Sequence, residues 1–267
     1  MKSEFRFIAT KETILFDEIV FGPIKSRRLG LSLGINLLPA SSKRCNFNCI
    51  YCECGATSLR SAEKRFHPAP VVLGKLDERL AQLKRDNVPV DTITFAGNGE
   101  PTMHPQFLRI VENTLYLRDI YFPGAKVAVL TNATMLNRQE VVKALNKADL
   151  RILKLDAGTE EMFQRINKPL VRRSLRWVVD HLHYFRNDLI IQSMFVKGHC
   201  GGEWIDNTTE AEVAAWLQLL NEIRPRQVMI YSLDRGTAES GLEGIPRHEL
   251  EKIAGRVIAL GINATVS

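Results

Sequence analysis

Three cysteines in one short run are the residues of this chain best suited to chemistry. Cys45, Cys49 and Cys52 stand in the run Arg-Cys-Asn-Phe-Asn-Cys-Ile-Tyr-Cys, a Cys-x3-Cys-x2-Cys spacing. Three thiolates on one loop can bind three irons of a [4Fe-4S] cluster and leave the fourth iron open. A fourth protein thiolate would close the cluster for electron transfer or structure, so the spacing indicates a cluster at which a small molecule can bind and react.

Two other uses of the cysteines are less favoured. Cys54 lies close behind Cys52, so a zinc site built from four thiolates is conceivable. Structural zinc sites usually combine two separated Cys-x2-Cys or Cys/His pairs, and the sequence has no second pair. Disulfides are less favoured still, because the chain has 5 cysteines, an odd number, and four of them crowd one loop.

A glycine turn downstream supplies a second set of ligand-binding groups. The segment from Asp91 to Phe95 is rich in Thr, Ile and Phe, which predicts a strand, and it leads into the run Ala-Gly-Asn-Gly-Glu-Pro-Thr-Met-His-Pro. Gly97 and Gly99 have no Cβ and let the backbone approach a ligand closely. Glu100 supplies a carboxylate that can accept hydrogen bonds from an ammonium group.

Together the two motifs resemble the radical S-adenosylmethionine (SAM) superfamily. The resemblance includes the aromatic Tyr51 before the third cysteine and the turn from Gly97 to Glu100, where Asn98 replaces the usual second glycine. It implies that the three cysteines bind a [4Fe-4S] cluster whose open iron chelates SAM, and that the turn binds the SAM amino group. One electron from the cluster would cleave SAM, and the 5'-deoxyadenosyl radical would take a hydrogen atom from an unidentified substrate.

The run from Phe21 to Gly34, with its Ser-Arg-Arg-Leu-Gly segment, narrows the resemblance. With the Glu-Pro-Thr segment it is similar to a subgroup often labelled Fe-S oxidoreductases, related to the wyosine-forming tRNA imidazoguanosine synthetases. Two alternative functions stay open: tRNA base modification, and iron-sulfur or zinc binding without SAM chemistry. The first is not favoured because no RNA-binding motif is evident. Against the second, a plain electron carrier needs no SAM amino-group site such as Glu100.

Length and composition predict a single domain over residues 1–267, with the cluster loop at residues 44–54. The chain is 45% hydrophobic and 25% charged, which is enough to bury a large core. No Cys-x2-Cys pair follows Cys54, so we expect no auxiliary cluster domain. The sequence has no apolar run that could span a bilayer, and its start, Met1 to Phe7, lacks the apolar stretch of a signal peptide. We therefore expect a cytoplasmic enzyme.

Strand and helix patterns alternate along the chain and predict an α/β fold of parallel βαβ units. The expected strands cover residues 31–37, 91–95, 126–131, 150–156, 189–196 and 227–233. The expected helices cover residues 73–84, 107–117, 138–146, 175–185, 210–223 and 247–260. Six such units match the partial, open (β/α)6 TIM-type barrel that the resemblance implies. In parallel α/β folds ligands bind at the carboxyl ends of the strands.

Polar residues on the later strands are further candidates for SAM binding, each with a plainer alternative. Asn132 could donate to the SAM ribose or carboxylate, or could simply form a turn. Lys154 and Asp156 would share the interior face of a strand, as an ion pair or as ligands, and we favour the ligand role for Asp156. By family analogy Ser193 could reach SAM, but it could equally be a packed hydroxyl. Tyr231 could pack on the adenine or belong to the core.

The remaining candidates concern the substrate radical and the partners. Cys200, in a glycine-rich loop expected after the fifth strand, could donate a hydrogen atom, although a free cysteine in a loop is more often incidental. The net charge is +6 and the pI about 9.1. Such charge could attract a phosphate backbone, or an acidic electron donor such as flavodoxin or ferredoxin. The basic residues close to the cluster loop in sequence are Lys25, Arg27, Arg28, Lys43 and Arg44.

Overall fold

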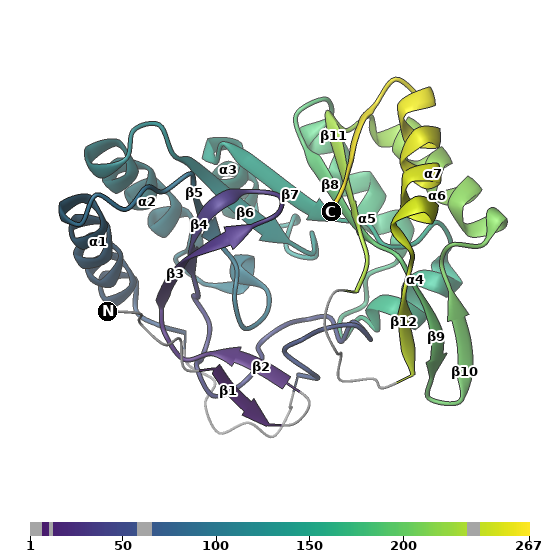
Figure 1. The fold of residues 1–267 in the computed structure, drawn as a ribbon, viewed down its shortest axis with the longest axis horizontal. Coiled ribbons are helices and arrows are strands. Elements are labelled where there is room, and N and C mark those ends of the chain that lie inside the picture. The colour runs from purple at the N-terminus through teal and green to yellow at the C-terminus, as the bar shows by residue number, and fades with distance from the viewer. Residues whose placement is uncertain (1–6, 11–12, 58–65, 234–240) are drawn as a thin grey trace. The chain divides into compact units, whose positions relative to one another are not determined.

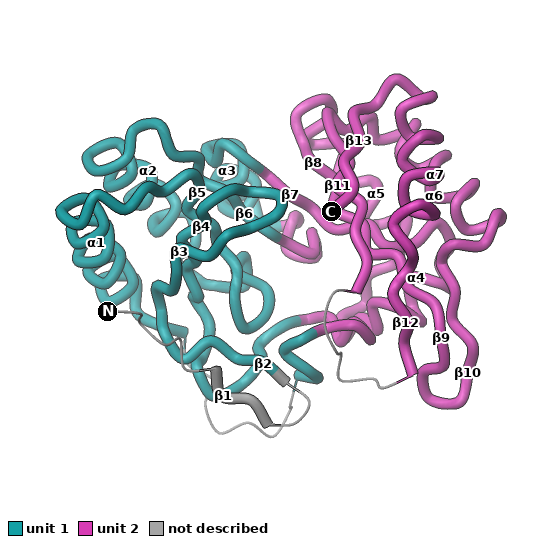
Figure 2. The backbone as a smooth tube through the Cα atoms, in the orientation of Figure 1, with its two compact units in different colours: residues 1–45, 53–130, 138–150 teal, residues 46–52, 131–137, 151–267 magenta. Residues whose placement is uncertain are grey.

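A computed structural model describes residues 7–10, 13–57, 66–233 and 241–267 (Figure 1). The chain forms two compact units, unit 1 with residues 1–45, 53–130 and 138–150, and unit 2 with residues 46–52, 131–137 and 151–267 (Figure 2). The cysteine run is divided between them, because Cys45 belongs to unit 1 and Cys49 and Cys52 to unit 2. That the whole chain is one domain stays a prediction.

In unit 1, four strands of the main sheet lie in the order β3 (Val20–Ser26), β4 (Gly30–Ile35), β5 (Thr92–Phe95) and β6 (Lys126–Thr131). The β3 strand is antiparallel to β4, whereas β4, β5 and β6 are parallel. The helices of this unit are α1 (Ala69–Arg85), the 3-10 helix η1 (Pro101–Met103), α2 (Phe107–Tyr121) and α3 (Gln139–Lys147). A separate hairpin joins β1 (Phe7–Thr10) to β2 (Thr13–Phe16).

Burial explains why these segments take their form. All four side chains of β5 are buried, as expected for a β-branched and aromatic strand covered on both faces. The α1 helix begins after Pro68, and Pro70 is tolerated in its first turn because an N–H there would have no acceptor within the helix. Its buried residues recur at helical spacing and form one apolar face: Ala69, Val72, Leu76, Leu80 and Leu83.

In unit 2, four parallel strands lie in the order β7 (Leu150–Lys154), β8 (Ile190–Met194), β11 (Gln227–Tyr231) and β13 (Asn263–Val266). The helices are α4 (Glu160–Asn167), α5 (Leu175–Leu182), the 3-10 helix η2 (His183–Phe185), α6 (Glu210–Ile223) and α7 (Arg247–Ala259). A small antiparallel sheet has the order β10 (Glu203–Asp206), β9 (Val196–Cys200) and β12 (Leu242–Gly244). No helix among the described residues has the length and apolar character to cross a membrane.

All six expected strands and all six expected helices are present, and the bounds of β6 and α6 are those predicted. Two expectations are wrong. Cys200 is the last residue of β9, not part of a loop, because the chain continues from β8 almost directly into a hairpin. The strand β7 ends at Lys154, so Asp156 lies beyond it. The sequence patterns also missed β1, β2, β3, α4, β9, β10, β12 and β13.

Candidate functional site

The glycine turn after β5 is held against the start of the cysteine run within unit 1. Arg44 and Gly99 form a parallel bridge. The Arg44 N–H donates to the Asn98 carbonyl at 2.8 Å, and the Glu100 N–H donates to the Arg44 carbonyl at 3.1 Å. Gly99 has φ +139°, and a Cβ there would lie 2.0 Å from the Arg44 carbonyl oxygen. Only glycine therefore allows this contact between the two motifs.

The Asn98 side chain holds the backbone of unit 1, and its expected role as a SAM ligand stays a prediction. It is fully buried, and its Nδ2 donates to the carbonyls of Phe16 and Pro39, both at 2.8 Å. Its Oδ1 accepts from the Phe16 N–H at 2.8 Å. Asparagine thus stands in a glycine position because its amide pairs three backbone groups that burial would otherwise leave unsatisfied.

Glu100 and Gly97 are also engaged within this turn. The Glu100 Oε1 accepts from the Thr102 N–H at 3.1 Å and from the Thr102 hydroxyl at 2.5 Å, so the carboxylate caps η1. The Gly97 carbonyl accepts from the Cys54 thiol at 3.6 Å. A Cβ on Gly97, which has φ +143°, would lie 2.6 Å from the Asn36 Oδ1. That Glu100 binds the SAM amino group stays a prediction.

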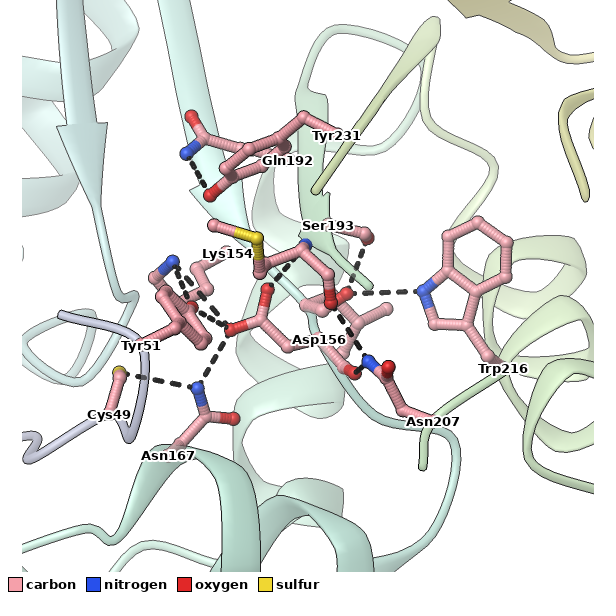
Figure 3. Close-up of polar contacts among 12 residues, drawn as sticks. Cys49, Tyr51, Lys154, Asp156, Asn167, Gln192, Ser193, Asn207, Trp216 and Tyr231 are labelled. Atoms are coloured by element: carbon pink, nitrogen blue, oxygen red, sulfur yellow. Dashed lines mark hydrogen bonds and ion pairs between the residues drawn. The ribbon is translucent and has the colours of Figure 1, made fainter. Parts of the chain in front are cut away.

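In unit 2, Asp156 is the centre of a buried polar network (Figure 3). Its Oδ2 accepts from the Tyr51 hydroxyl and, at 2.7 Å, from the Asn167 Nδ2, and it lies 3.6 Å from the Lys154 Nζ. Its Oδ1 accepts from the Met194 N–H at 2.9 Å. Both carboxylate oxygens are occupied by protein groups. These contacts include the ion pair with Lys154 that was the alternative, and the favoured ligand role of Asp156 stays a prediction.

Burial and the neighbouring charges shift the pKa values of Tyr51, Lys154 and Cys49 in this network. The Lys154 Nζ donates to the Tyr51 hydroxyl oxygen at 2.7 Å. Burial raises the pKa of Tyr51, and the Asp156 carboxylate raises it further, so the phenol stays neutral. Burial is the largest single influence and lowers the pKa of Lys154, but Asp156 acting together with Tyr231, Cys49 and Cys52 raises it overall. Burial raises the pKa of the Cys49 thiol, while Lys154 and the Asn167 amide oppose the shift.

Strand register shows that Ser193 and Gln192 face opposite sides of the sheet. Lys154 lies opposite Gln192 on the neighbouring strand, and side chains alternate along a strand, so Gln192 shares the face of Lys154 and Ser193 does not. Ser193 is fully buried and donates to the Leu155 carbonyl, as the packed-hydroxyl alternative expects, and its role in SAM binding stays a prediction. Gln192 was missed, although counting alternate residues would have found it. Its Nε2 donates to the Tyr231 hydroxyl at 2.6 Å.

Asn132 joins the cysteine run to the turn after β6 within unit 2. Its Nδ2 donates to the Asn46 Oδ1 at 2.9 Å. Its Oδ1 accepts from the Thr134 N–H at 3.1 Å and from the Thr134 hydroxyl at 2.6 Å. The Oδ1 therefore forms the turn that the plainer alternative expected. The Nδ2 supports the cysteine run through Asn46.

Cys200 is buried inside the small antiparallel sheet. It is 6% exposed, and the Lys168 Nζ lies 3.5 Å from its sulfur. This position gives no support to hydrogen donation from Cys200 to a substrate radical.

The basic residues expected beside the cysteine run do not form one patch. Arg27 and Arg28 lie in the turn before β4, whereas Arg44 is bonded to the turn beyond the other end of the paired strands β4 and β5, roughly 20 Å away within unit 1. Lys43 is buried, and its Nζ donates to the Gly55 carbonyl at 2.7 Å. Arg44 lies over the Phe66 ring, 4.1 Å from its centroid.

The cysteine run offers three thiols spaced as ligands for an iron-sulfur cluster. None of the five cysteines forms a disulfide. In the part of the chain that the structure describes, no group of three or more His, Cys, Asp or Glu residues is arranged to hold a metal ion. The fit to an iron-sulfur cluster rests on the cysteine spacing and on the Asn167 Nδ2, which donates to the Cys49 sulfur at 3.4 Å.

Comparison with other sequences identifies relatives over most of the chain. The chain is 35% identical over 216 residues to UPF0026 protein slr1464 of Synechocystis sp., which covers 79% of this chain and 74% of the relative. It is 31% identical over 183 residues to a UPF0026 protein of Helicobacter pylori, covering 67% of this chain and 57% of the relative. A Brachyspira hyodysenteriae protein named GTPase Obg is 29% identical, and the match covers 87% of this chain but 32% of that protein. This chain therefore spans about a third to three fifths of the length of the latter two relatives.

Solved structures confirm the predicted fold. A radical SAM methyltransferase from Sphaerobacter thermophilus matches with a TM-score of 0.68 at 14% identity, covering 98% of this chain and 75% of that chain. Streptococcus suis SuiB bound to S-adenosylmethionine matches with a TM-score of 0.61 at 14% identity, covering 85% of this chain and 48% of that chain. The fold is the α/β partial TIM-type barrel of these proteins. The link to wyosine-forming enzymes stays a prediction. Residues 40–199, more than half of the chain, match the model of the Radical SAM superfamily, so the chain belongs to the radical SAM superfamily.

Proposed function

We propose that this protein is a radical SAM enzyme that cleaves SAM reductively and removes a hydrogen atom from a substrate yet to be identified. In this proposal Cys45, Cys49 and Cys52 bind one [4Fe-4S] cluster. The observation that carries it is the backbone clamp between Arg44 and Gly99, because it joins the loop of the cluster cysteines to the turn proposed for SAM. A loop that only stored or carried electrons has no need of that second motif.

The residues of the chain would divide the work in the following way. When bound, the cluster supplies the electron and the open coordination site for SAM. Gly97 and Gly99 allow the backbone to approach the ligand, and the Glu100 carboxylate accepts from the SAM ammonium group. Tyr51, fixed by Asp156 and Lys154, keeps the second half of the cysteine loop in place.

Electron supply and location are part of the same proposal. We assign the reduction step to flavodoxin or ferredoxin, both acidic one-electron donors that a chain of net charge +6 attracts. A cytoplasmic location fits a cluster held by thiolates, because that compartment keeps cysteines reduced. The protein would be an oxidoreductase because the proposed reaction cleaves SAM reductively, so this description depends on that reaction.

Anaerobic reconstitution with iron and sulfide tests this function. The purified protein should bind about four irons and four sulfides per chain and form 5'-deoxyadenosine when dithionite and SAM are added. Replacing Cys45, Cys49 and Cys52 together by Ala should abolish iron binding, whereas the matched control Cys54→Ala should keep it. A colourless protein that holds one zinc and never loads iron would overturn the proposal.

The Glu100→Gln variant tests the SAM site separately. Glutamine keeps the shape of the cap on η1 and removes the charge that would attract the ammonium group. The affinity of the reconstituted protein for SAM should fall roughly tenfold to a hundredfold, since a hydrogen bond to a charged group contributes about 1.5–3 kcal/mol. Unchanged affinity, measured by equilibrium dialysis with full iron loading, would show that the turn has another role.

A further inference from the structure

The end of α4 forms an edge that supports the second half of the cysteine run within unit 2. The Asn48 N–H donates to the carbonyls of Asn167 and Lys168, both at 3.1 Å, and the Ile50 N–H donates to the Ile166 carbonyl at 2.9 Å. These bonds flank Cys49 on both sides. The backbone of residues 48–50 therefore has a fixed path past the end of this helix.

Sequence explains why the helix ends at this place. Lys168 takes the left-handed conformation, with φ +40°, and its N–H closes the helix on the Gln164 carbonyl. Pro169 follows and cannot continue the helix, and it forms an antiparallel bridge with Phe47. The Phe47 ring packs edge-on against Phe163, with the ring centroids 5.6 Å apart. The last helical residue, Asn167, is thus held beside Cys49.

The Asn167 side chain reaches the Cys49 sulfur. It is 1% exposed, and its Nδ2 lies 3.4 Å from the Cys49 Sγ and 2.7 Å from the Asp156 Oδ2 (Figure 3). A primary amide has two N–H groups, so one nitrogen can serve both acceptors. If the Asn167 amide were turned over, its oxygen would face the Asp156 carboxylate, and two acceptors cannot form a hydrogen bond. Asp156 therefore fixes the direction in which the amide donates to sulfur.

We propose that Asn167 is a positioning residue that orients Cys49 and raises the reduction potential of the cluster through this N–H···S hydrogen bond. The inference rests on the cluster assignment made under the proposed function. Reduction adds negative charge to the cluster and its thiolates, so a donor aimed at a ligand sulfur stabilises the reduced state more than the oxidised state. The bond lies in a buried setting, where a hydrogen bond to a charged acceptor is stronger than in water.

The test compares the midpoint potential of the reconstituted wild-type protein with that of the Asn167→Leu variant, by EPR-monitored redox titration. Leucine has a similar volume and no donor. The equilibrium between oxidised and reduced cluster should shift about tenfold toward the oxidised form, a fall of ~59 mV for one electron. Asn167→Gln keeps an amide and should recover part of the shift.

The control is Asn207→Leu, in another buried asparagine of the same unit. The Asn207 Nδ2 donates to the carbonyls of Asp156 and Met194, and its Oδ1 accepts from the Val196 N–H, so the variant loses three hydrogen bonds and no contact with sulfur. It should lower the thermal stability and leave the midpoint potential unchanged. A potential equal to that of wild type in Asn167→Leu, or an equal shift in the control, would overturn the inference.

A measurement on the wild-type protein keeps the inference testable if Asn167→Leu does not hold a cluster. Protein labelled with 15N in its asparagine side-chain amides should show a weak nitrogen coupling to the reduced cluster in pulsed EPR, and Asn167→Gln should lose it. A coupling absent from the loaded wild-type protein would contradict the hydrogen bond. Failure of the proposed function is a different result, because then the wild-type protein itself would hold no reducible cluster.

Discussion

Asn98 departs from the usual residue of the glycine turn and still stabilises that turn. Where the motif that this turn resembles has a glycine, this chain has an amide that binds three backbone groups on two distant segments, at Phe16 and Pro39. The main chain of the same residue accepts from Arg44. The side chain thus stabilises the turn, and in the proposed function the neighbouring glycines leave the backbone open to SAM. Function and stability are therefore separable at this turn.

The Asn98→Gly variant tests this separation. Restoring the usual glycine removes three buried hydrogen bonds and should lower the free energy of unfolding by about 2–4 kcal/mol, at roughly 1 kcal/mol for each bond. Guanidinium unfolding of the metal-free protein measures the loss. The control Asn113→Ala, which removes a bond on the surface of α2, should change stability by less than about 0.5 kcal/mol. A variant of wild-type stability that no longer binds SAM would show instead that Asn98 is a ligand.

The main elements could be predicted because their patterns are long and regular. The apolar run of β6 and the helical spacing in α6 fix their bounds without tertiary information. By contrast, α4 has eight residues, and its signals are local ones: the Thr159 cap, the acidic first turn and Pro169 after its end. The equally short α5 could be predicted because its four buried apolar residues recur at helical spacing. In α4 only Met162, Phe163 and Ile166 are apolar and buried, which is too short a pattern, so α4 and the Asn167 that it carries were not predicted.

The same limit applies to the candidate site. The cysteines and glycines could be identified because their chemistry depends on residue type and spacing. The roles of Asp156 and Ser193 depend on where a strand ends and which way its side chains face, and the sequence places strand ends only to within a few residues. The predicted end of β7 was two residues too late, so the sequence placed Asp156 on the strand and not in the buried network that follows it.

His104, between η1 and α2, makes the stability of this junction sensitive to pH. Its Nδ1 accepts from the Gln106 N–H at 3.0 Å, and its Nε2 donates to the His67 carbonyl at 2.8 Å, so the neutral ring suits both bonds. Burial lowers the pKa of His104 below its usual value near 6.5. The unfolded chain therefore takes up a proton at a higher pH than the folded chain. Stability from this group is complete above about pH 6.5 and is lost as the pH falls through the lower, folded pKa.

The His104→Asn variant should flatten this dependence. Urea unfolding of the metal-free protein at pH 7.5 and pH 5.5 would give the change in stability, and wild type should lose more than the variant, by at most about 1.4 kcal/mol per pH unit for one proton. His248→Asn, at an exposed histidine on α7, is the matched control and should behave as wild type. Equal pH dependence in wild type and His104→Asn would mean that the ring is not held neutral.

The charge of the whole molecule bears on how an electron donor reaches it. The net charge of +6 acts over a range set by salt, because the Debye length is about 8 Å at 0.15 M ionic strength and about 30 Å at 0.01 M. Arg27 and Arg28 lie roughly 20 Å from Arg44 within unit 1, at the other end of the paired strands β4 and β5. This distance is longer than the Debye length at 0.15 M ionic strength and shorter than the Debye length at 0.01 M.

Reduction of the loaded protein by reduced flavodoxin, followed by stopped flow, should therefore respond to these arginines only at low salt. The double variant Arg27→Gln/Arg28→Gln lowers the net charge from +6 to +4. Its rate constant should stay within about twofold of wild type at 0.15 M and fall further at 0.01 M. The control Lys75→Gln/Lys84→Gln on α1 makes the same change of charge and should follow the same course, because both pairs act only through the long-range field. A tenfold loss at 0.15 M, confined to the arginine variant, would mean that the donor docks on the β3–β4 turn itself, and the electron would then have to enter from the opposite end of the strand to the one proposed for the cluster.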